Sequence, residues 1–195
     1  RCMPITLLGP SNYVSMPWKN GKGETLELNS EESDDDTGFL WRLSIASVVE
    51  DGLFSDFTDY QRILILLDGN GMTLDHKEKS PLITRYDYCE FKGETNTHAT
   101  LHDGPITDFN IMCREGRYKA RPPKIITDQK TDVASDAQHQ FFYAAELPGK
   151  WWSADKPQPI TIPSQHLLWI SQCETDSAYA QGAGIIQIQI DSVLP

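Results

Sequence analysis

The sequence predicts an all-β protein, built as a sandwich or a barrel. Short segments with β-type patterning recur along the 195 residues, and clusters of Gly, Pro, Asn and Asp separate them. Helical periodicity is nearly absent, so no helical layer is expected. With 39% apolar residues, a chain of this length can bury a sizeable core, either as one domain or as two small fused halves. We expect one compact globule.

Ten segments carry the clearest strand pattern, with alternating apolar positions and many β-branched and aromatic residues. These segments are residues 25–28, 40–48, 62–67, 72–75, 97–102, 107–113, 140–147, 160–162, 167–172 and 185–190. The last segment alternates Ile with Gln, which indicates one buried face and one wet face.

Two polar stretches, 31–36 and 128–139, are predicted to be exposed loops, because neither contains large apolar residues. The first is acidic but lacks the spacing of a calcium-binding loop. The second divides the chain into two strand-rich parts, residues 1–127 and 128–195. We therefore expect two β-barrel halves fused in one chain.

Composition excludes several classes of partner. The formal net charge of −11, with 17 basic and 28 acidic residues, argues against nucleic acid and against an anionic membrane surface. No segment approaches the roughly 20 apolar residues of a membrane helix, so a cytoplasmic location is expected. The four scattered cysteines, Cys2, Cys89, Cys113 and Cys173, are expected to be reduced and mostly buried.

The most informative segment is GLFSDFTDYQRILILLDGNGMTL, residues 52–74. An apolar run at 63–67 ends in a turn at Gly69 and Gly71 and returns at 72–74, which predicts a hairpin. This hairpin resembles the central hairpin of cupins. Cupins bind a metal with a His-x-His pair and a Glu before the hairpin glycine, and with a further His in a second motif.

The resemblance places Ser55 and Phe57 at the His-x-His pair, Arg62 at the Glu and Ile106 at the second-motif His. None of these residues can build the usual metal site, because Phe57 has no donor atom and Arg62 is cationic. We therefore expect no metal and no cofactor. Asn110 matches the Asn that closes the second motif.

One alternative metal site remains open at His98 and His102. Their even separation puts both side chains on one face of a strand. The other interpretation is that they are two ordinary polar strand residues.

Arg62 is the residue of greatest interest, because a guanidinium in place of an inward-facing carboxylate turns a cation site into an anion site. Its fork of donors fits a carboxylate bidentately. The alternative is that Arg62 merely pairs with Asp59, Asp68 or another local acid.

A second arginine lies on the strand FLWRLSIASV, where Arg42, Ser44 and Ala46 share one face and Trp41 lies on the other. The Arg42 face carries only polar or small residues, so it faces either solvent or a cavity. Trp41 fits core packing better than a ligand platform.

The segment WKNGKGET, residues 18–25, places two glycines on either side of Lys22. Its backbone amides could bind an oxyanion, or the segment could be no more than a tight turn into the next strand.

Four phrases together, WKNGKGETLEL, FLWRLSIASV, the hairpin segment above and TDFNIM, resemble the HutD/Ves family of bacterial proteins. They occur in the family's order and span about the first 115 residues. The resemblance implies a bicupin-like fold, no established enzymatic activity, and an association with histidine utilisation or stress response. For HutD-type members it implies sensing of an intermediate such as N-formylglutamate or urocanate.

The leading hypothesis is a regulatory protein, rather than an enzyme, that binds a small anionic metabolite in its N-terminal barrel. The expected ligand-binding residues are Arg62, Arg42, Asn20, Ser44, Ser55 and Asn110, with aromatic walls from Trp41 and Phe57.

Two other classes of function remain open. A metal-free isomerase or hydrolase could draw acid and base groups from Tyr60, Asp56, Glu24 and Asp108. A protein-interaction module, such as a homodimer, could use sheet edges or the Trp151–Trp152 pair, of which at most one member can be core.

Overall fold

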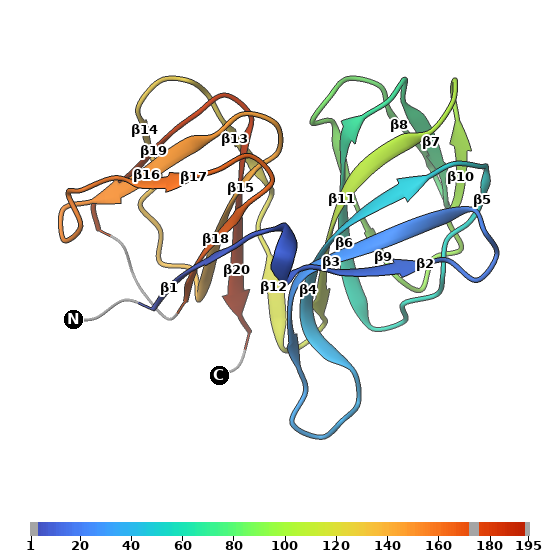
Figure 1. Cartoon of the computed structure of the whole chain (residues 1–195). Helices are drawn as coiled ribbons and strands as arrows, with labels where there is room; N and C mark the ends of the chain where they lie inside the picture. Colours follow the sequence, from blue (N-terminus) through green and yellow to red (C-terminus); the bar gives the residue numbers. More distant parts are fainter. Residues whose placement is uncertain (1–3, 172–175, 194–195) are drawn as a thin grey trace. The chain divides into compact units, whose positions relative to one another are not determined.

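The computed structural model describes residues 4–171 and 176–193, and almost all regular structure in these ranges is β-strand (Figure 1). The helical element described there is a single 3-10 turn, η1 (Pro10–Asn12). Across the same two ranges, no helix has the length and apolar composition that crossing a membrane requires. The all-β prediction is confirmed.

All ten predicted strands form, and their observed bounds differ from the predicted ones mainly at the ends. They are β3 (Gly23–Glu32), β4 (Phe39–Val48), β6 (Tyr60–Asp68), β7 (Met72–Asp75), β10 (His98–Leu101), β11 (Ile106–Arg114), β15 (His139–Ala144), β17 (Ile160–Ile162), β18 (Leu167–Ser171) and β20 (Ile185–Ser192). Strand β3 is longer than predicted because it pairs with β4 from Gly23 to Glu32. Strand β15 ends before Leu147, whose side chain is exposed. The predicted end of β18 at Gln172 lies outside the described residues.

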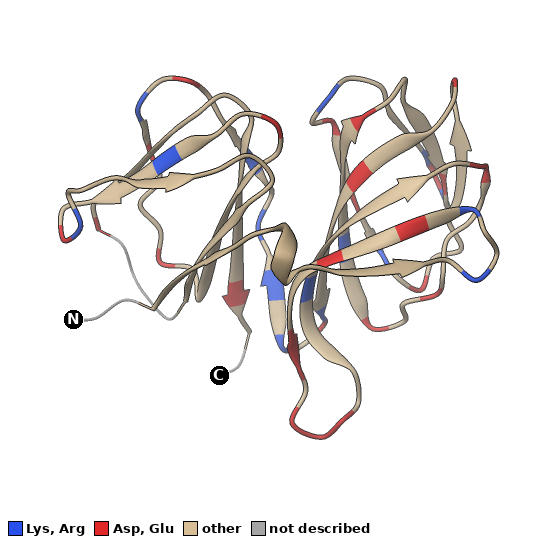
Figure 2. Cartoon of the chain, in the orientation of Figure 1, with Lys and Arg blue, Asp and Glu red and all other residues tan. Residues whose placement is uncertain are grey.

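The acidic stretch 31–36 is only partly a loop. Glu31 and Glu32 are the last residues of β3, and the Glu31 carboxylate accepts a hydrogen bond of 2.6 Å from the indole of Trp41. Asp34, Asp35 and Asp36 form the exposed turn between β3 and β4, where acidic residues gather in Figure 2. The prediction was therefore wrong for the two glutamates, because cross-strand pairing with β4 extends the strand into the acidic run.

The polar stretch 128–139 is also more ordered than predicted. Residues Thr131–Asp132 form strand β14, and the side chains of Val133, Ser135, Ala137 and His139 are buried. Several of these residues are small. Their burial was not predicted, because the sequence pattern indicates burial mainly through large apolar side chains. The exposed-loop prediction was wrong for β14 and for these four buried residues, while six of the twelve residues in the stretch are exposed as predicted.

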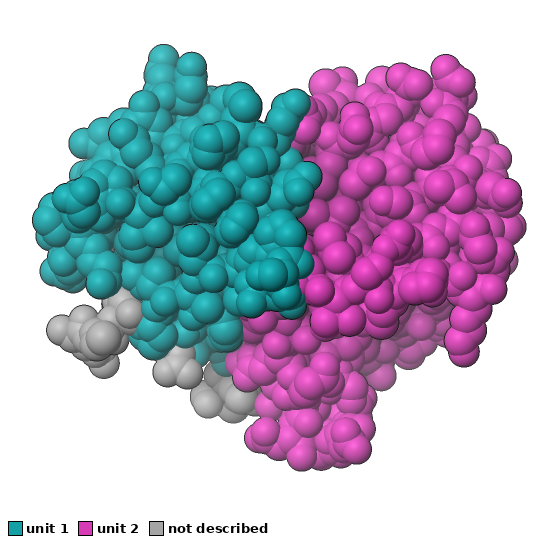
Figure 3. Space-filling model, in the orientation of Figure 1, with its two compact units in different colours: residues 1–12, 120–195 teal, residues 13–119 magenta. Residues whose placement is uncertain are grey.

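The chain divides into two compact units, one of residues 13–119 and one of residues 1–12 and 120–195 (Figure 3). Two units were expected, but with a boundary between residues 127 and 128 and with the N-terminus in the first. The N-terminal residues instead join the C-terminal unit, because strand β1 (Ile5–Leu8) pairs antiparallel with β18 from Ile5↔Ile170 to Leu8↔Leu167. A pairing between such distant segments leaves no local signal in the sequence.

The unit of residues 13–119 contains two antiparallel sheets. The larger sheet has the order β2-β3-β4-β11-β6-β9, with β2 at Val14–Pro17 and β9 at Tyr88–Lys92. The smaller has the order β5-β10-β7-β8, with β5 at Gly52–Leu53 and β8 at Lys79–Leu82. An apolar cluster that includes Leu64, Leu66, Met72, Leu74 and Phe91 draws on both sheets.

The other unit repeats this plan. Its larger sheet has the order β1-β18-β15-β20-β12, with β12 at Tyr118–Ala120, and β13 (Lys124–Ile126) also pairs with β20. Its smaller sheet has the order β14-β19-β16-β17, with β19 at Ala178–Gln181 and β16 at Gly149–Ser153. Phe142, Trp151 and Leu168 lie in an apolar cluster that fills this unit. In β20 the Ile and Gln side chains from 185 to 190 are all buried, so the prediction of one solvent-exposed face was wrong.

The two tryptophans on β16 differ as expected for neighbouring strand residues. Trp151 is fully buried, whereas Trp152 is half-buried and lies beside Tyr179 with 5.8 Å between ring centroids. Cys89 is half-buried and Cys113 is buried, while Cys2 and Cys173 lie outside the described residues.

The predicted turn forms between β6 and β7, and Gly69 there has φ +102°. The predicted hairpin was wrong, because β6 pairs with β9 and β11 in the larger sheet whereas β7 pairs with β8 and β10 in the smaller one. A Cβ at this position would lie 2.6 Å from the carbonyl oxygen of Pro105. We predict that Gly69→Ala lowers the free energy of unfolding by about 2 kcal/mol or more, because both the backbone strain and the clash must be accommodated. Urea denaturation measures this difference.

The control is Gly104→Ala. Gly104 also has a positive φ, of +79°, but a Cβ there would meet nothing within 4 Å. Its substitution should therefore cost about 1 kcal/mol from strain alone. Equal losses for the two variants would show that the close approach to Pro105 does not constrain the turn between β6 and β7.

Candidate functional site: an arginine-lined cavity

A cavity of about 580 Å³ lies within the unit of residues 13–119. Its lining comes from the β2–β3 turn, from β4, from the segment before β6, and from β6 and β11. The lining residues that carry polar groups or aromatic rings are Trp18, Lys19, Asn20, Thr25, Arg42, Ser44, Phe54, Ser55, Phe57, Arg62, Asp108 and Asn110.

The floor of the cavity is formed by one face of three neighbouring strands, β4, β11 and β6. Met112 lies opposite Arg42 on one side and Arg62 on the other. Asn110, two residues earlier on β11, points to the same face because side chains alternate along a strand. The two arginines therefore start from backbones about 10 Å apart, with one strand between them.

Arg62 is an almost fully buried cation, with 6% of its surface exposed. One of its terminal nitrogens donates to Oδ1 of Asn110 at 3.1 Å. Burial lowers the pKa of Arg62 to about 10, against the opposing attraction of Asp108, and the nearby charge of Arg42 lowers the pKa further. At neutral pH the side chain nevertheless remains charged.

Aromatic rings surround the Arg62 guanidinium. Its central carbon lies 5.1 Å from the ring centroid of Phe91, 5.2 Å from that of Phe57 and 5.5 Å from that of Phe54. Cation–π contacts of this kind hold a guanidinium in place without using its hydrogen-bond donors.

Arg42 is half-buried and shares one of these rings. Its guanidinium carbon lies 4.3 Å from the centroid of Phe39 and 5.4 Å from that of Phe57. Burial lowers the pKa of Arg42, and the charge of Glu27 opposes this effect. Phe57 therefore contacts both cations, which brings two guanidinium groups to one region of the cavity.

Asp108 is the third charged group of the cavity, and it is fully buried. Burial raises its pKa to about 7, although the charge of Arg62 and a hydrogen bond from Asn110 act in the opposite direction. The Asn110 amide donates to Oδ1 of Asp108 at 2.5 Å, so Asn110 links this carboxylate to Arg62.

Three polar atoms of the cavity lack a partner within the described ranges 4–171 and 176–193. They are Nε of Arg42, Nε of Arg62 and Oδ2 of Asp108, all buried and without a hydrogen bond. A buried polar atom without a partner is unfavourable by about 1–3 kcal/mol, so such atoms are uncommon unless another molecule pairs with them.

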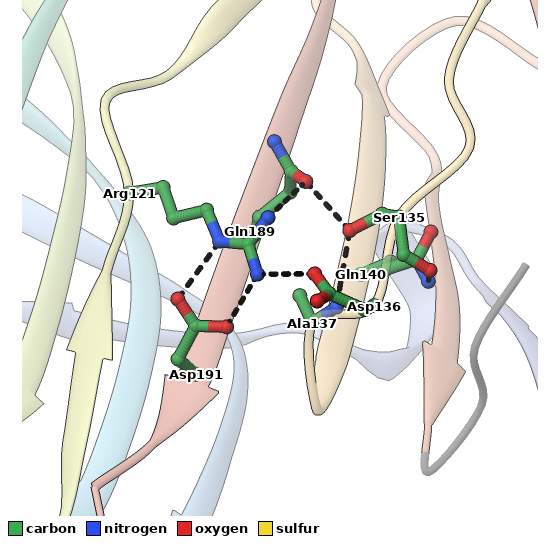
Figure 4. Close-up of polar contacts among 7 residues, drawn as sticks. All are labelled: Arg121, Ser135, Asp136, Ala137, Gln140, Gln189 and Asp191. Atoms are coloured by element: carbon green, nitrogen blue, oxygen red, sulfur yellow. Dashed lines mark hydrogen bonds and ion pairs between the residues drawn. The ribbon is translucent and has the colours of Figure 1, made fainter.

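Arg121, in the other unit, shows the opposite arrangement (Figure 4). Its Nε and one terminal nitrogen contact the carboxylate of Asp191 at 2.8 and 2.7 Å, and the same terminal nitrogen contacts Asp136 at 2.7 Å. Its remaining terminal nitrogen donates to Gln189, which also accepts from Ser135. Arg121 is thus paired with protein acceptors at every nitrogen, as a structural arginine is, whereas the cavity arginines keep free donors.

Seven of the eight expected ligand-binding residues line the cavity: Arg62, Arg42, Asn20, Ser44, Ser55, Asn110 and Phe57. Trp41 does not. It is fully buried on the opposite face of β4, because it directly precedes Arg42 and neighbouring side chains point to opposite faces. Its inclusion as an aromatic wall was wrong.

Phe54 and Trp18 are aromatic residues of the cavity lining that were not predicted from the sequence. Asp108 was considered there only as an acid or base, although its position two residues before Asn110 on one strand was sufficient to place both on the same face.

The other proposed acid and base groups lie outside the cavity lining. The Tyr60 hydroxyl donates to the carbonyl of Phe39 at 2.6 Å, and Glu24 accepts from Ser15. Asp56 is exposed and accepts from Thr58. Asp108 is therefore the candidate acid or base that the cavity contains.

The 18–25 segment forms a tight turn. The amide of Trp18 donates to the carbonyl of Gly23 at 2.9 Å, and the amide of Gly21 donates to the carbonyl of Trp18 at 3.1 Å. These amides serve the turn itself, while the side chains of Lys19 and Asn20 contribute to the cavity rim.

The residues at the cupin metal positions do not fit a metal. Arg62 presents a buried positive charge and Phe57 an apolar ring, and neither can coordinate a divalent cation. Across the described parts of the chain, no three His, Cys, Asp or Glu side chains gather in a cluster that could hold a metal ion. His98 and His102 are exposed, and His102 pairs with Thr73 at 2.7 Å.

The family model named HutD matches residues 10–188 of this chain. The chain belongs to the HutD family. Among relatives of known sequence, Protein Ves from Cronobacter sakazakii is 32% identical over 154 residues, covering 78% of this chain and 80% of that protein. An uncharacterized 21.2 kDa protein in the hutC 3′ region of Pseudomonas putida is 43% identical over 119 residues. That match covers 60% of this chain and 62% of the relative.

Solved structures extend the likeness of this HutD-family chain to nearly its whole length. HutD from Pseudomonas fluorescens SBW25 has a TM-score of 0.84 at 28% identity, covering 97% of this chain and 99% of that chain. A conserved protein of unknown function from Pseudomonas aeruginosa PAO1 has a TM-score of 0.86 at 31% identity, covering 97% and 100%. A bacterial pirin from Escherichia coli, with a TM-score of 0.61 at 7% identity, shares the fold alone. The resemblance and the bicupin fold inferred from the sequence are confirmed.

The Asp108 carboxyl predicts a dependence of stability on pH. Because its pKa rises from 3.8 to about 7 on folding, the native state holds a proton that the unfolded state releases between these values. The stability contributed by this group is fully present below pH 3.8 and is lost as the pH rises to about 7. We predict that Asp108→Asn raises the free energy of unfolding at pH 8 by about 1–3 kcal/mol and changes it little at pH 4.

Urea denaturation of both proteins from pH 4 to pH 8 measures this effect. The wild type should lose stability relative to the variant as the pH rises through that range. Parallel curves for the two proteins would mean that Asp108 has an ordinary pKa in the folded state.

Proposed function

We propose that this HutD-family protein is a regulatory binding protein that senses a small carboxylate in the cavity of its 13–119 unit. The observation that carries the proposal is the buried guanidinium of Arg62, which retains an unpartnered donor in an aromatic-walled cavity. A carboxylate would supply the missing acceptors bidentately and compensate the charges of buried Arg62 and half-buried Arg42.

The location of a relative in the hutC 3′ region supports a link to histidine utilisation. Small carboxylates of that pathway, such as urocanate and N-formylglutamate, are therefore the first ligands to test. Both are small enough for a cavity of about 580 Å³. No metal or other cofactor is part of the proposal, and dimer formation through Trp152 stays a prediction.

We predict that urocanate, N-formylglutamate or histidine raises the thermal unfolding midpoint of the wild type, because a ligand that binds only the folded state stabilises it. Arg62→Met should weaken the binding by about 100-fold or more, since it removes the buried partner of the ligand's charge. Thermal-shift titration followed by calorimetry gives both quantities.

The matched control is Arg85→Met. Arg85 is exposed and lies over the ring of Tyr86, away from the cavity lining, so its loss should leave the affinity unchanged. The proposal fails if no pathway carboxylate stabilises the wild type, or if Arg62→Met binds as tightly as Arg85→Met.

A second candidate function is catalysis by Asp108. A buried carboxyl with a pKa of about 7 and a free oxygen suits proton transfer near neutral pH. Turnover of the same carboxylates by the purified protein, followed by NMR, distinguishes an enzyme from a sensor. Turnover that Asp108→Asn abolishes would favour the enzyme.

A further inference from the structure

The cavity lining changes in character along the strands of its floor. On β4 the lining residues are Arg42, Ser44, Ala46 and Val48, which are alternate residues of one strand. At a rise of about 3.3 Å per residue, the backbones of Arg42 and Val48 lie about 20 Å apart along the strand. The lining therefore extends well beyond the arginines, from a cationic end at Arg42 to an end formed by the small and apolar side chains of Ala46 and Val48.

Strands β3 and β2, which lie beside β4 in Figure 1, continue the apolar end. Met16 pairs with Thr25, and Thr25 pairs with Ala46, so these three lining residues form one row across the sheet. The Trp18 indole donates to the Thr25 hydroxyl at 2.8 Å, which places the Trp18 ring beside this row. Asp108 pairs with Ala46 on the other side, but it is fully buried and presents no surface to a bound molecule.

The mouth of the cavity carries exposed apolar side chains. Met16 and Leu53 both belong to the lining, and 41% and 66% of their surfaces are exposed. Behind them, Val48 is buried in an apolar cluster against which Trp18 and Phe54 pack. Apolar side chains that are scattered singly over a surface need no explanation, whereas those that gather around one cavity indicate a binding groove.

The size of the cavity agrees with a ligand that fills both ends. A volume of about 580 Å³ lies within the range of sites that enclose drug-sized ligands. Such sites are lined mainly by apolar and aromatic side chains, and a few polar groups fix the orientation of the ligand. A carboxylate confined to the arginine end would leave the apolar end of this volume unused.

We infer that the ligand is amphipathic: its carboxylate pairs with Arg62, and an apolar arm lies along β4 against Ala46 and Val48. The chemical class comprises medium-chain and phenyl-substituted monocarboxylic acids. The inference rests on the carboxylate site of the proposed function and goes beyond the polar pathway acids named there, because it assigns a ligand group to the apolar half of the lining.

The experiment compares butyrate, hexanoate and octanoate by calorimetry at pH 7. Burial of one methylene group strengthens binding by about threefold, so the affinity should rise by about 80-fold from butyrate to octanoate. Acids that bind too weakly for direct titration are measured by their competition with octanoate. Octanamide has the same arm without the charge, and it should bind about 10-fold or more weakly than octanoate because it cannot pair with Arg62.

Ala46→Leu tests the position of the arm. The larger side chain would occupy part of the apolar end, so octanoate should bind about 10-fold or more weakly while the affinity for butyrate changes by less than about twofold. Retained binding of butyrate also shows that the variant folds. The matched control is Ser47→Leu, on the next residue of β4, whose side chain is exposed and points away from the cavity. This control should bind all three acids as the wild type does.

The outcomes separate this inference from the proposed function. If butyrate and the polar pathway acids bind in an Arg62-dependent way but octanoate gains nothing over butyrate, the inference is overturned and the proposed function stands. Equal weakening of octanoate and butyrate by Ala46→Leu would also overturn the inference alone. If octanamide binds as tightly as octanoate and Arg62→Met changes neither, or if none of the acids binds at millimolar concentration, both are overturned.

Discussion

The burial of the Arg62 guanidinium is the constraint on which the site depends. A cation removed from water is unfavourable unless nearby groups compensate for its lost hydration. Here the compensation is incomplete: three aromatic rings, one amide oxygen and the more distant charge of Asp108 surround it, and Nε remains unpartnered. Under the proposed function, an anion would complete this compensation, and the free protein tolerates the unpartnered donor at some expense of stability.

The two units use one architecture in different ways. Each combines a six-stranded with a four-stranded sheet. In the unit that contains the C-terminal strands, Phe142, Trp151 and Leu168 fill the space between the sheets, and Arg121 is held by two carboxylates. In the other unit, polar side chains of β4, β6 and β11 face a cavity.

Strand positions and most of the site could be predicted from the sequence, because both follow from alternation along single strands. Arg62 and Asn110 were placed through the cupin hairpin and the closing Asn, and the face shared by Arg42 and Ser44 followed from the period of two. The turn at Gly69 was predicted from the glycines that follow the apolar run, and the positive φ of Gly69 agrees with that prediction.

What the sequence could not show depends on contacts between distant segments. The pairing of β1 with β18 moves the N-terminus into the other unit, and the burial of Ser135 depends on its hydrogen bond to Gln189. The choice between solvent and cavity for the Arg42 face was open for the same reason. The structure shows that this face lies toward the cavity, because Phe57, from a separate segment, contacts both Arg42 and Arg62.

The overall charge of the protein means that the proposed anion recognition must have a local origin. A chain with a formal net charge of −11 does not attract anions from a distance, and salt would screen such an attraction beyond about 8–10 Å in any case. The cations that matter are those inside the cavity, together with Lys19 at its rim. Because their field acts through an apolar, aromatic-walled space, it is strong at short range only. For the proposed function, selectivity must then come from how a ligand fits the cavity around Arg62 and Arg42, because charge alone does not distinguish one small anion from another.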